Sequence, residues 1–293
     1  MRLVTITHAR DCLCLRFVET GQFPRAGDMN SATPRILVLG DLHNAVDRAE
    51  AILTRWRDRY DQAVLLGDYF DDFGDSPAEA RHSALWLAGS LLREERIHLL
   101  GNHDLAYLFP SNHALFCPGF TAEKCRAITE VLAAAPRDRL HLAWSAGPWL
   151  FSHAGLHPSF AGNATPAALA EKAEALRPGL AAGRSGTWLS VGMARGGRAA
   201  VGGITWQDWN EEFQPVRGVN QIVGHTPCPG VARGRHLRAD GSIARSEVYA
   251  TGERIGPIPS PDTPPFVSVN WCLDTDLEIV ALLTGQEIEF RTP

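Results

Sequence analysis

The chain has 293 residues, of which 45% are hydrophobic and 21% are charged, and this composition excludes an intrinsically disordered protein. The formal net charge of −5 excludes a broadly basic surface, so we expect no stable nucleic-acid binding. No apolar run is long enough to cross a bilayer, and the first residues lack a basic segment followed by an apolar one, so the sequence predicts a cytoplasmic protein without a membrane partner.

The first residues predict an N-terminal extension, residues 1–33, before a main domain of residues 34–293. Apolar runs at 3–7 and 13–18 favour a β-hairpin packed on that domain.

From residue 35 onward, short apolar runs alternate with segments of helical periodicity. The runs 36–39, 63–66 and 97–100 predict buried strands, and each is followed directly by a glycine. Helices are predicted between them at 46–60 and 77–95. Because this alternation is typical of βαβ units, the sequence predicts an α/β fold with a largely parallel sheet.

The second half of the chain has weaker patterns. A helix is predicted at 165–176, because Thr165 is a favourable N-cap residue. Residues 140–144 and 148–152 predict two paired strands around a glycine turn, and the glycine-rich segment 177–203 is expected to be an irregular loop. The other predicted elements are a helix at 121–135 and strands at 221–223, 245–250, 266–269, 277–283 and 287–291.

The cysteines are scattered along the chain and form no Cys-x-x-Cys pair. Disulfide frameworks are typical of short secreted domains. We therefore expect buried free thiols at Cys12, Cys14, Cys117, Cys125, Cys228 and Cys272.

Polar residues able to bind metals follow several of the predicted strands directly. Carboxyl ends of strands form the ligand sites of open α/β sheets, so we expect these side chains to meet at one edge. Carboxylates, an amide oxygen and imidazoles suit Mn, Fe or Zn, and two such ions can clamp a phosphoryl group. The segments are Gly40-Asp41-Leu42-His43-Asn44, Gly67-Asp68-Tyr69-Phe70-Asp71-Asp72, Gly101-Asn102-His103-Asp104, Ser152-His153-Ala154-Gly155 and Gly224-His225-Thr226-Pro227.

In chain order, GDLHN, GDYFDD, GNHD, SHAG and GHTP resemble the sequence blocks of the calcineurin-like metallophosphoesterases. The resemblance covers about residues 35–230. It implies a four-layer αββα sandwich of two mixed β-sheets flanked by helices, so that residues 34–293 would be a metallophosphoesterase domain. GDYFD, SHAGLHPSF, QIVGHTP and CLDT resemble segments of the phosphoprotein-phosphatase branch, closest to its bacterial and phage members, which are Ser/Thr phosphatase-like.

The resemblance also implies a centre of two divalent metal ions, with Mn²⁺ expected and Fe, Zn or Mg as alternatives. Pro227 stands where many relatives have a second histidine, so the first ion should keep more water. Asp68 would bridge the ions. The implied ligands are Asp41, His43 and Asp68 for the first ion, and Asp68, Asn102, His153 and His225 for the second.

His103 is implied to be the general acid, with Asp71 as the carboxylate that pairs with it. The implied reaction is direct attack of a metal-bridging hydroxide on phosphorus, without a covalent enzyme intermediate. One residue differs from the pattern of the phosphoprotein-phosphatase branch. Asp72 stands at the position where members of that branch have an arginine that binds the substrate phosphate. Arginines that could replace it are Arg195, Arg198 and Arg217, and the sequence leaves the choice among them open.

The leading hypothesis is therefore a dinuclear metal-dependent phosphoesterase that hydrolyses phosphate monoesters of a small molecule, a nucleotide or a phosphoprotein, as a Ser/Thr phosphatase-like enzyme does. A dinucleoside polyphosphate hydrolase or a phosphodiesterase acting on nucleotides is the enzymatic alternative. The non-enzymatic alternative is a protein-binding scaffold of the same fold. Such scaffolds usually lose the catalytic histidine or several ligands, whereas this chain keeps His103 and every ligand position.

Overall fold

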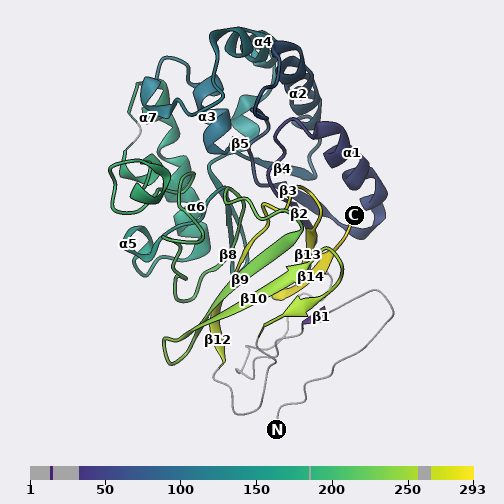
Figure 1. Ribbon diagram of the computed structural model, residues 1–293, viewed down its shortest axis with the longest axis vertical. Coiled ribbons are helices and arrows are strands. Elements are labelled where there is room, and N and C mark those ends of the chain that lie inside the picture. The colour runs from purple at the N-terminus through teal and green to yellow at the C-terminus, as the bar shows by residue number, and fades with distance from the viewer. Residues whose placement is uncertain (1–13, 16–32, 185, 257–264) are drawn as a thin grey trace, which may run out of the picture.

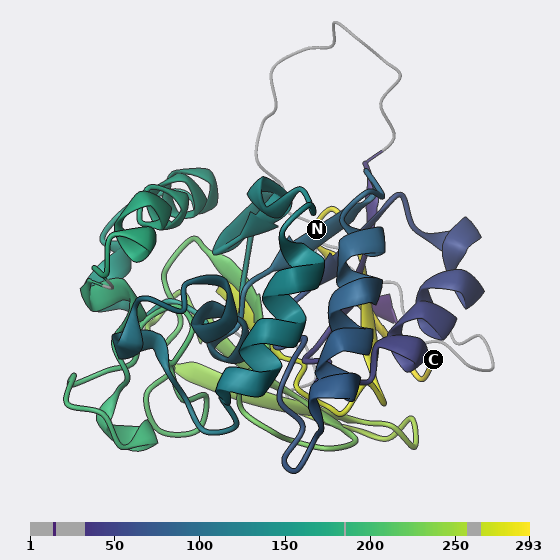
Figure 2. The same ribbon diagram turned by 90° about the horizontal axis from the view of Figure 1, so that it is seen from above.

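The computed structural model describes residues 14–15, 33–184, 186–256 and 265–293. Two seven-stranded β-sheets form the centre of this part of the chain, and each sheet has parallel and antiparallel neighbours. Helices flank the sheets (Figures 1 and 2). The predicted α/β sandwich of two mixed sheets flanked by helices is thereby confirmed.

The first sheet carries three of the metal-binding motifs on its central strands. Its order is β1-β14-β13-β2-β3-β4-β5, with β2 to β5 parallel and β13 antiparallel to β2. Its strands are β1 (Cys14–Leu15), β2 (Arg35–Leu39), β3 (Gln62–Leu65), β4 (Arg96–Leu99), β5 (Leu140–His141), β13 (Val280–Thr284) and β14 (Glu287–Arg291).

The second sheet carries the two remaining motifs, which follow β7 and β8. Its order is β11-β10-β9-β12-β8-β7-β6, and β7, β8 and β12 run parallel. Its strands are β6 (Ala143–Ala146), β7 (Trp149–Ser152), β8 (Asn220–Val223), β9 (Val231–Arg238), β10 (Ile243–Tyr249), β11 (Arg254–Ile255) and β12 (Phe266–Cys272).

Helices α1, α2 and α4 lie side by side over the first sheet, and α6 packs on β6 and β7 (Figure 2). The α-helices are α1 (Val46–Arg55), α2 (Pro77–Ser90), α3 (Asn102–Leu108), α4 (Ala122–Leu132), α5 (Pro158–Ala161), α6 (Pro166–Glu174) and α7 (Arg177–Ala181). Short 3-10 helices are η1 (Arg57–Arg59), η2 (His113–Leu115), η3 (Arg137–Arg139), η4 (Thr187–Leu189) and η5 (Met193–Arg195).

β2 is buried on both faces and contributes to the two largest hydrophobic clusters of the core. Successive side chains of a strand point to opposite faces. Val38 packs between the sheets with Phe151 and Trp271, whereas Leu37 and Leu39 pack in the cluster that includes the inner faces of the helices. Burial on both faces explains why β2 is a continuous apolar run rather than an alternating pattern.

Helix starts follow the capping signals in the sequence. The Ser76 hydroxyl accepts a hydrogen bond from the Glu79 amide at 3.3 Å, and the Glu79 carboxylate accepts one from the Ser76 amide at 2.7 Å, which closes a capping box before α2. The Thr165 hydroxyl accepts from the Ala168 amide at 3.3 Å, so the predicted N-cap of α6 is confirmed.

Two predictions for the second half were wrong. Residues 140–144 are not one strand, because β5 ends the first sheet and β6 begins the second, with Leu142 between them. The segment 177–203 is not wholly irregular, since it contains α7, η4 and η5. The predicted pair around a glycine turn is confirmed in shortened form as β6 and β7, which are antiparallel.

The predicted N-terminal hairpin lies outside the described residues except for β1, which pairs with β14. Four of the predicted free thiols are free and buried, namely Cys117, Cys125, Cys228 and Cys272. No helix of the described residues is long and apolar enough to cross a membrane.

Candidate metal centre and active site

The structure brings the six predicted metal ligands together at the carboxyl ends of five strands. Asp41 and His43 follow β2, Asp68 follows β3, and Asn102 begins α3 after β4. His153 and His225 follow β7 and β8 of the other sheet. The site thus forms where the ends of both sheets meet.

Asp68 is the central residue of the cluster, because it belongs to two groups of metal-binding atoms. In the group Asp41, His43 and Asp68, and in the group Asp68, His153 and His225, the ligand atoms lie within 4.8 Å of one another. The Asp68 Oδ2 atom is 3.7 Å from His43 Nε2 and 3.3 Å from His153 Nε2. One carboxylate shared by two donor sets is the arrangement that lets two ions bind side by side.

Asn102 joins the second group through its side-chain oxygen, which lies 3.0 Å from His153 Nε2. His153 Nε2 is also 3.2 Å from His225 Nδ1. On its other side, His153 Nδ1 lies 3.0 Å from the Leu66 carbonyl oxygen, which can accept its proton. This hydrogen bond directs the lone pair of Nε2 into the cluster, as the outer contacts of metal-binding histidines do.

Two motif glycines are required because carboxylates occupy the space beside them. A Cβ atom at Gly101 would lie 1.9 Å from Asp68 Oδ1, and one at Gly224 would lie 1.8 Å from Asp41 Oδ1. Any side chain there would displace a central carboxylate.

The site also concentrates unusual backbone conformations. His43, Asp68, Asp71 and His225 have φ values of 41°, 50°, 64° and 70°. Non-glycine residues in this region cost on the order of 1–3 kcal/mol each, and such residues cluster at functional sites. The fold therefore holds these four side chains in place against local backbone preference.

The electrostatics of the cluster favour a cation. Burial alone would lower the pKa of His153, but the carboxylates of Asp68 and Asp41 raise it to about 10. Burial would likewise lower the pKa of His43, and the same carboxylates raise it to about 9. These buried carboxylates therefore require positive charge beside them, which metal ions would provide in place of ring protons.

One unsatisfied atom also fits a metal centre. His225 Nε2 is buried and has no hydrogen-bond partner among the described residues. Such orphaned groups are rare in folded proteins unless an ion or water satisfies them. The carboxylate, amide and imidazole donors thus fit divalent metal ions.

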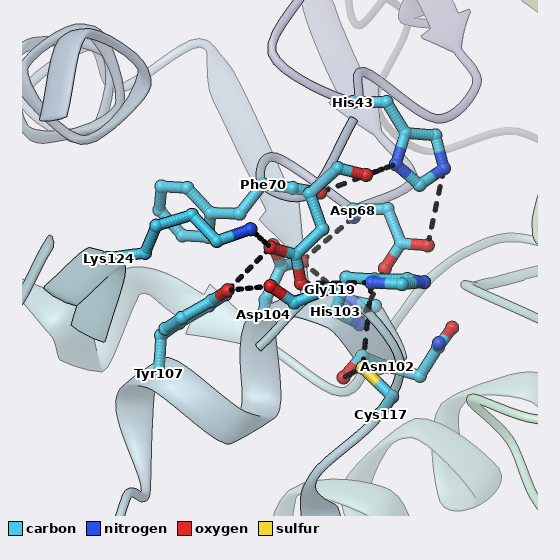
Figure 3. Close-up of polar contacts among 12 residues, drawn as sticks. His43, Asp68, Phe70, Asn102, His103, Asp104, Tyr107, Cys117, Gly119 and Lys124 are labelled. Carbon is cyan, nitrogen blue, oxygen red and sulfur yellow. Dashed lines mark hydrogen bonds and ion pairs between the residues drawn. The ribbon is translucent and has the colours of Figure 1, made fainter. Parts of the chain in front are cut away.

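His103 and Asp71 are paired as predicted. His103 Nδ1 lies 3.1 Å from Asp71 Oδ2, and the His103 amide donates to Asp68 Oδ1 at 3.0 Å. Two residues that the motifs do not include fix the other oxygen of Asp71 (Figure 3). Lys124 Nζ and Tyr107 Oη each donate to Asp71 Oδ1 at 2.5 Å. Burial would raise the pKa of Asp71, but hydrogen bonds from His103, Lys124 and Tyr107 lower it below its ordinary value, which keeps the carboxylate ionised.

Asp104, the last residue of the GNHD motif, has a structural role that the sequence analysis missed. Its carboxylate accepts hydrogen bonds from the amides of Gly101, Asp68 and Tyr69, each at 2.8 Å. These bonds connect the loop after β3 to the loop after β4. Asp104 therefore fixes the position of Asp68 relative to Asn102.

The structure distinguishes among the three candidate arginines. Arg195 Nη2 donates to Thr226 Oγ1 at 2.9 Å and to the His225 carbonyl oxygen at 3.4 Å, so it lies beside the metal-ligand loop. Arg198 and Arg217 are exposed, and Arg217 donates to the Ala239 carbonyl oxygen on the turn after β9.

Asp72 is exposed, unlike its buried neighbour Asp71. A carboxylate at this position cannot replace the missing arginine. Of the arginines the sequence left open, Arg195 is the one that reaches the cluster.

A family model described as calcineurin-like phosphoesterase matches residues 34–229. The chain belongs to the calcineurin-like phosphoesterase family. It is a metal-dependent phosphoesterase of two mixed β-sheets with flanking helices.

Similar solved structures include a cold-active protein tyrosine phosphatase, at 16% identity and a TM-score of 0.46 over 76% of this chain and 78% of that chain. A metallophosphoesterase from Sphaerobacter thermophilus matches at 17% identity and a TM-score of 0.39, over 89% of this chain and 88% of that one. A protein serine/threonine phosphatase from Saccharomyces cerevisiae matches at 12% identity and a TM-score of 0.34, over 80% and 84%. No curated protein matches the chain.

Proposed function

We propose that the chain is a dinuclear phosphatase that hydrolyses phosphate monoesters, of the kind that Ser/Thr phosphatase-like enzymes accept. The observation that carries the proposal is the position of Asp68, shared by two donor groups and hydrogen-bonded to the backbone of His103. The proposed ligands are Asp41, His43 and Asp68 for one ion, and Asp68, Asn102, His153 and His225 for the other. We propose Mn²⁺ as the ion.

When bound, the two ions would supply positive charge to the phosphoryl group and lower the pKa of water. The residues of the chain hold the ions, orient the substrate and move protons. Asp104 fixes the relative positions of the loop after β3 and the loop after β4. Its hydrogen bond from the Asp68 amide also maintains the strained backbone conformation of Asp68.

His103 is the proposed general acid. Its Nδ1 lies 3.1 Å from the ionised Asp71, which orients the ring and leaves Nε2 to give a proton to the leaving oxygen of the ester. The ring is 12% exposed, so a substrate can reach it. Lys124 and Tyr107 act through Asp71, because they fix the carboxylate oxygen that His103 does not contact.

Arg195 is the proposed phosphate-binding cation. Its Nε lies 2.9 Å from Asp208 Oδ2, which anchors the side chain, and its Nη1 makes no hydrogen bond to any described residue. A planar guanidinium with free donors is suited to phosphate oxygens. The half-buried Trp206, whose ring centre is 5.6 Å from that of His225, supplies an apolar wall nearby.

The test compares p-nitrophenyl phosphate with bis(p-nitrophenyl) phosphate in Mn²⁺-loaded protein. The monoester is the better substrate by kcat/KM if the proposal holds. Arg195→Met should raise KM for the monoester by about 10- to 100-fold, because removing one charge-assisted bond costs about 1.5–3 kcal/mol. The rise should be smaller for the bis ester, which carries less charge. Arg198→Met is the matched control and should leave both unchanged. A strong preference for the bis ester contradicts the proposal and favours a phosphodiesterase.

A further inference from the structure

Asp274 is a buried acid beside the metal centre that the ligand assignment does not use. It is 6% exposed, and its Oδ2 atom has no hydrogen-bond partner among the described residues. An unpaired carboxylate in a protein interior is unfavourable by several kcal/mol unless a cation or a donor faces it.

The backbone places Asp274 between two loops that carry proposed metal ligands. The Leu273 carbonyl oxygen lies against Gly40, where a Cβ atom would approach it to 2.0 Å. The Asp274 carbonyl oxygen accepts a hydrogen bond from the Cys228 amide at 2.8 Å. Asp274 is thus held between the loop that carries Asp41 and the loop that follows β8.

The turn after Asp274 is strained in the same way as the ligand loops. Asp276 and Leu277 have φ values of 58° and 53°, and a leucine in this region is a marked outlier. The Thr275 hydroxyl spans the turn, since it accepts from the Ile279 amide at 3.1 Å. A fold that maintains such a turn fixes the position of the preceding side chain.

Asp274 is electrostatically coupled to the first ligand group. Burial raises the pKa of Asp274 to about 6, with a contribution from Asp68, while His43 and His153 lower it. Asp274 in turn raises the pKa of Asp41 and of His43. Its carboxylate is nevertheless outside the group of ligand atoms that lie within 4.8 Å of one another.

This inference rests on the proposed function. We propose that Asp274 is an outer residue of the first metal site, where it would accept hydrogen bonds from water molecules bound to the cation that Asp41, His43 and Asp68 hold. Three side chains would leave about half of the coordination positions of an ion such as Mn²⁺ to water, because Mn²⁺ favours octahedral oxygen coordination. Those waters need acceptors, and the Asp274 Oδ2 atom is a buried acceptor that receives no hydrogen bond from the part of the chain that the structure describes. Its negative charge adds to the affinity of the site for a divalent cation.

The test uses Asp274→Asn, which keeps the shape and removes the charge. In metal-stripped protein, Mn²⁺ titration by calorimetry should give two ions for both wild type and variant. One of the two should bind about 10- to 100-fold more weakly in the variant, the usual range for loss of an outer contact. The exposed Asp276→Asn, in the same turn, is the matched control and should bind as wild type does.

The melting temperature is a second readout, because a residue with a purely structural role would not change it in the way expected for Asp274. Without metal, Asp274→Asn should melt higher than wild type, because it removes a carboxylate whose burial is unfavourable. With Mn²⁺ added, the rise in melting temperature should be smaller for the variant than for wild type.

The experiment distinguishes failure of the proposed function from failure of the proposed role of Asp274. Wild-type protein that binds no Mn²⁺ overturns the proposed function. Wild type that binds two ions, with Asp274→Asn matching it in both affinities and in metal-dependent stabilisation, overturns the role of Asp274 alone. A variant that melts lower both with and without Mn²⁺ likewise overturns it, in favour of a packing role.

Discussion

Replacing Lys124 by methionine tests the ion-pair network behind His103. Lys124 Nζ bonds Asp71 at 2.5 Å and Asp75 at 2.9 Å, and its side chain is 3% exposed. Methionine keeps the length of the chain but leaves two buried carboxylates without their cation. Breaking a buried pair by removing one partner costs about 3–5 kcal/mol. Because Tyr107 and His103 still donate to Asp71, we expect the lower end, about 3 kcal/mol of unfolding free energy.

The assay is urea unfolding of Mn²⁺-loaded protein, followed by fluorescence, with kcat measured on the folded variant. We expect kcat to fall about tenfold, part of the 10²–10⁴ that a general acid contributes, because Asp71 is less firmly placed against His103. KM should change little, since the Lys124 side chain is 3% exposed and is paired with Asp71 and Asp75 rather than with a proposed phosphate-binding residue.

The only other lysine in the sequence, Lys172, gives a matched control. It is exposed and lies 4.7 Å from the centre of the Trp188 ring, a contact worth about 0.5–1 kcal/mol. Lys172→Met should leave kcat unchanged. If Lys124→Met unfolds within about 1 kcal/mol of Lys172→Met, the reasoning about the buried pair is refuted.

Two further predictions concern the proton donor and the pH dependence of stability. His103→Ala should lower kcat by about 10²–10⁴, with a larger fall for phenyl phosphate than for p-nitrophenyl phosphate, because the poorer leaving group depends more on a proton; equal falls for both esters would count against His103 as the acid. His98 is fully buried between Tyr69 and Ser90, and burial lowers its pKa to about 3. Since its pKa is about 6.5 in the unfolded chain, only the unfolded state takes up the proton as pH falls below 6.5, and stability falls by about 1.4 kcal/mol per unit. Between pH 7 and pH 5, the free energy of unfolding measured in urea should therefore fall by about 2 kcal/mol less in His98→Gln than in wild type. Equal falls would show that His98 is not held neutral.

Strands with an apolar run before a glycine could be predicted from the sequence, and the polar residues after them indicated where the site forms. β2 is the clearest case, since every residue after Arg35 is apolar and buried on one face or the other, whereas β4 contains the buried His98. β9 was missed, since its inward positions are Ala232, Gly234 and His236, and small or polar residues hide the alternating pattern.

The residues that support the site were beyond the reach of spacing arguments. Lys124 and Tyr107 lie on helices far along the chain from Asp71, and only the packing of α3 and α4 brings them to one carboxylate. Asp104 stands within a motif, but its role as an acceptor for three amides depends on the loop after β3. Arg195 could be singled out only once its contact with the loop of His225 was known.

The central claim is that Asp68 bridges two metal ions that the enzyme needs for phosphate ester hydrolysis. The most direct measurement is hydrolysis of p-nitrophenyl phosphate by metal-stripped protein before and after Mn²⁺ is restored, with Asp68→Asn measured in parallel. We predict no turnover without metal, turnover that saturates at two ions per chain, and loss of both turnover and one bound ion in the variant. Full turnover in the stripped protein, or wild-type activity in Asp68→Asn, would contradict the claim.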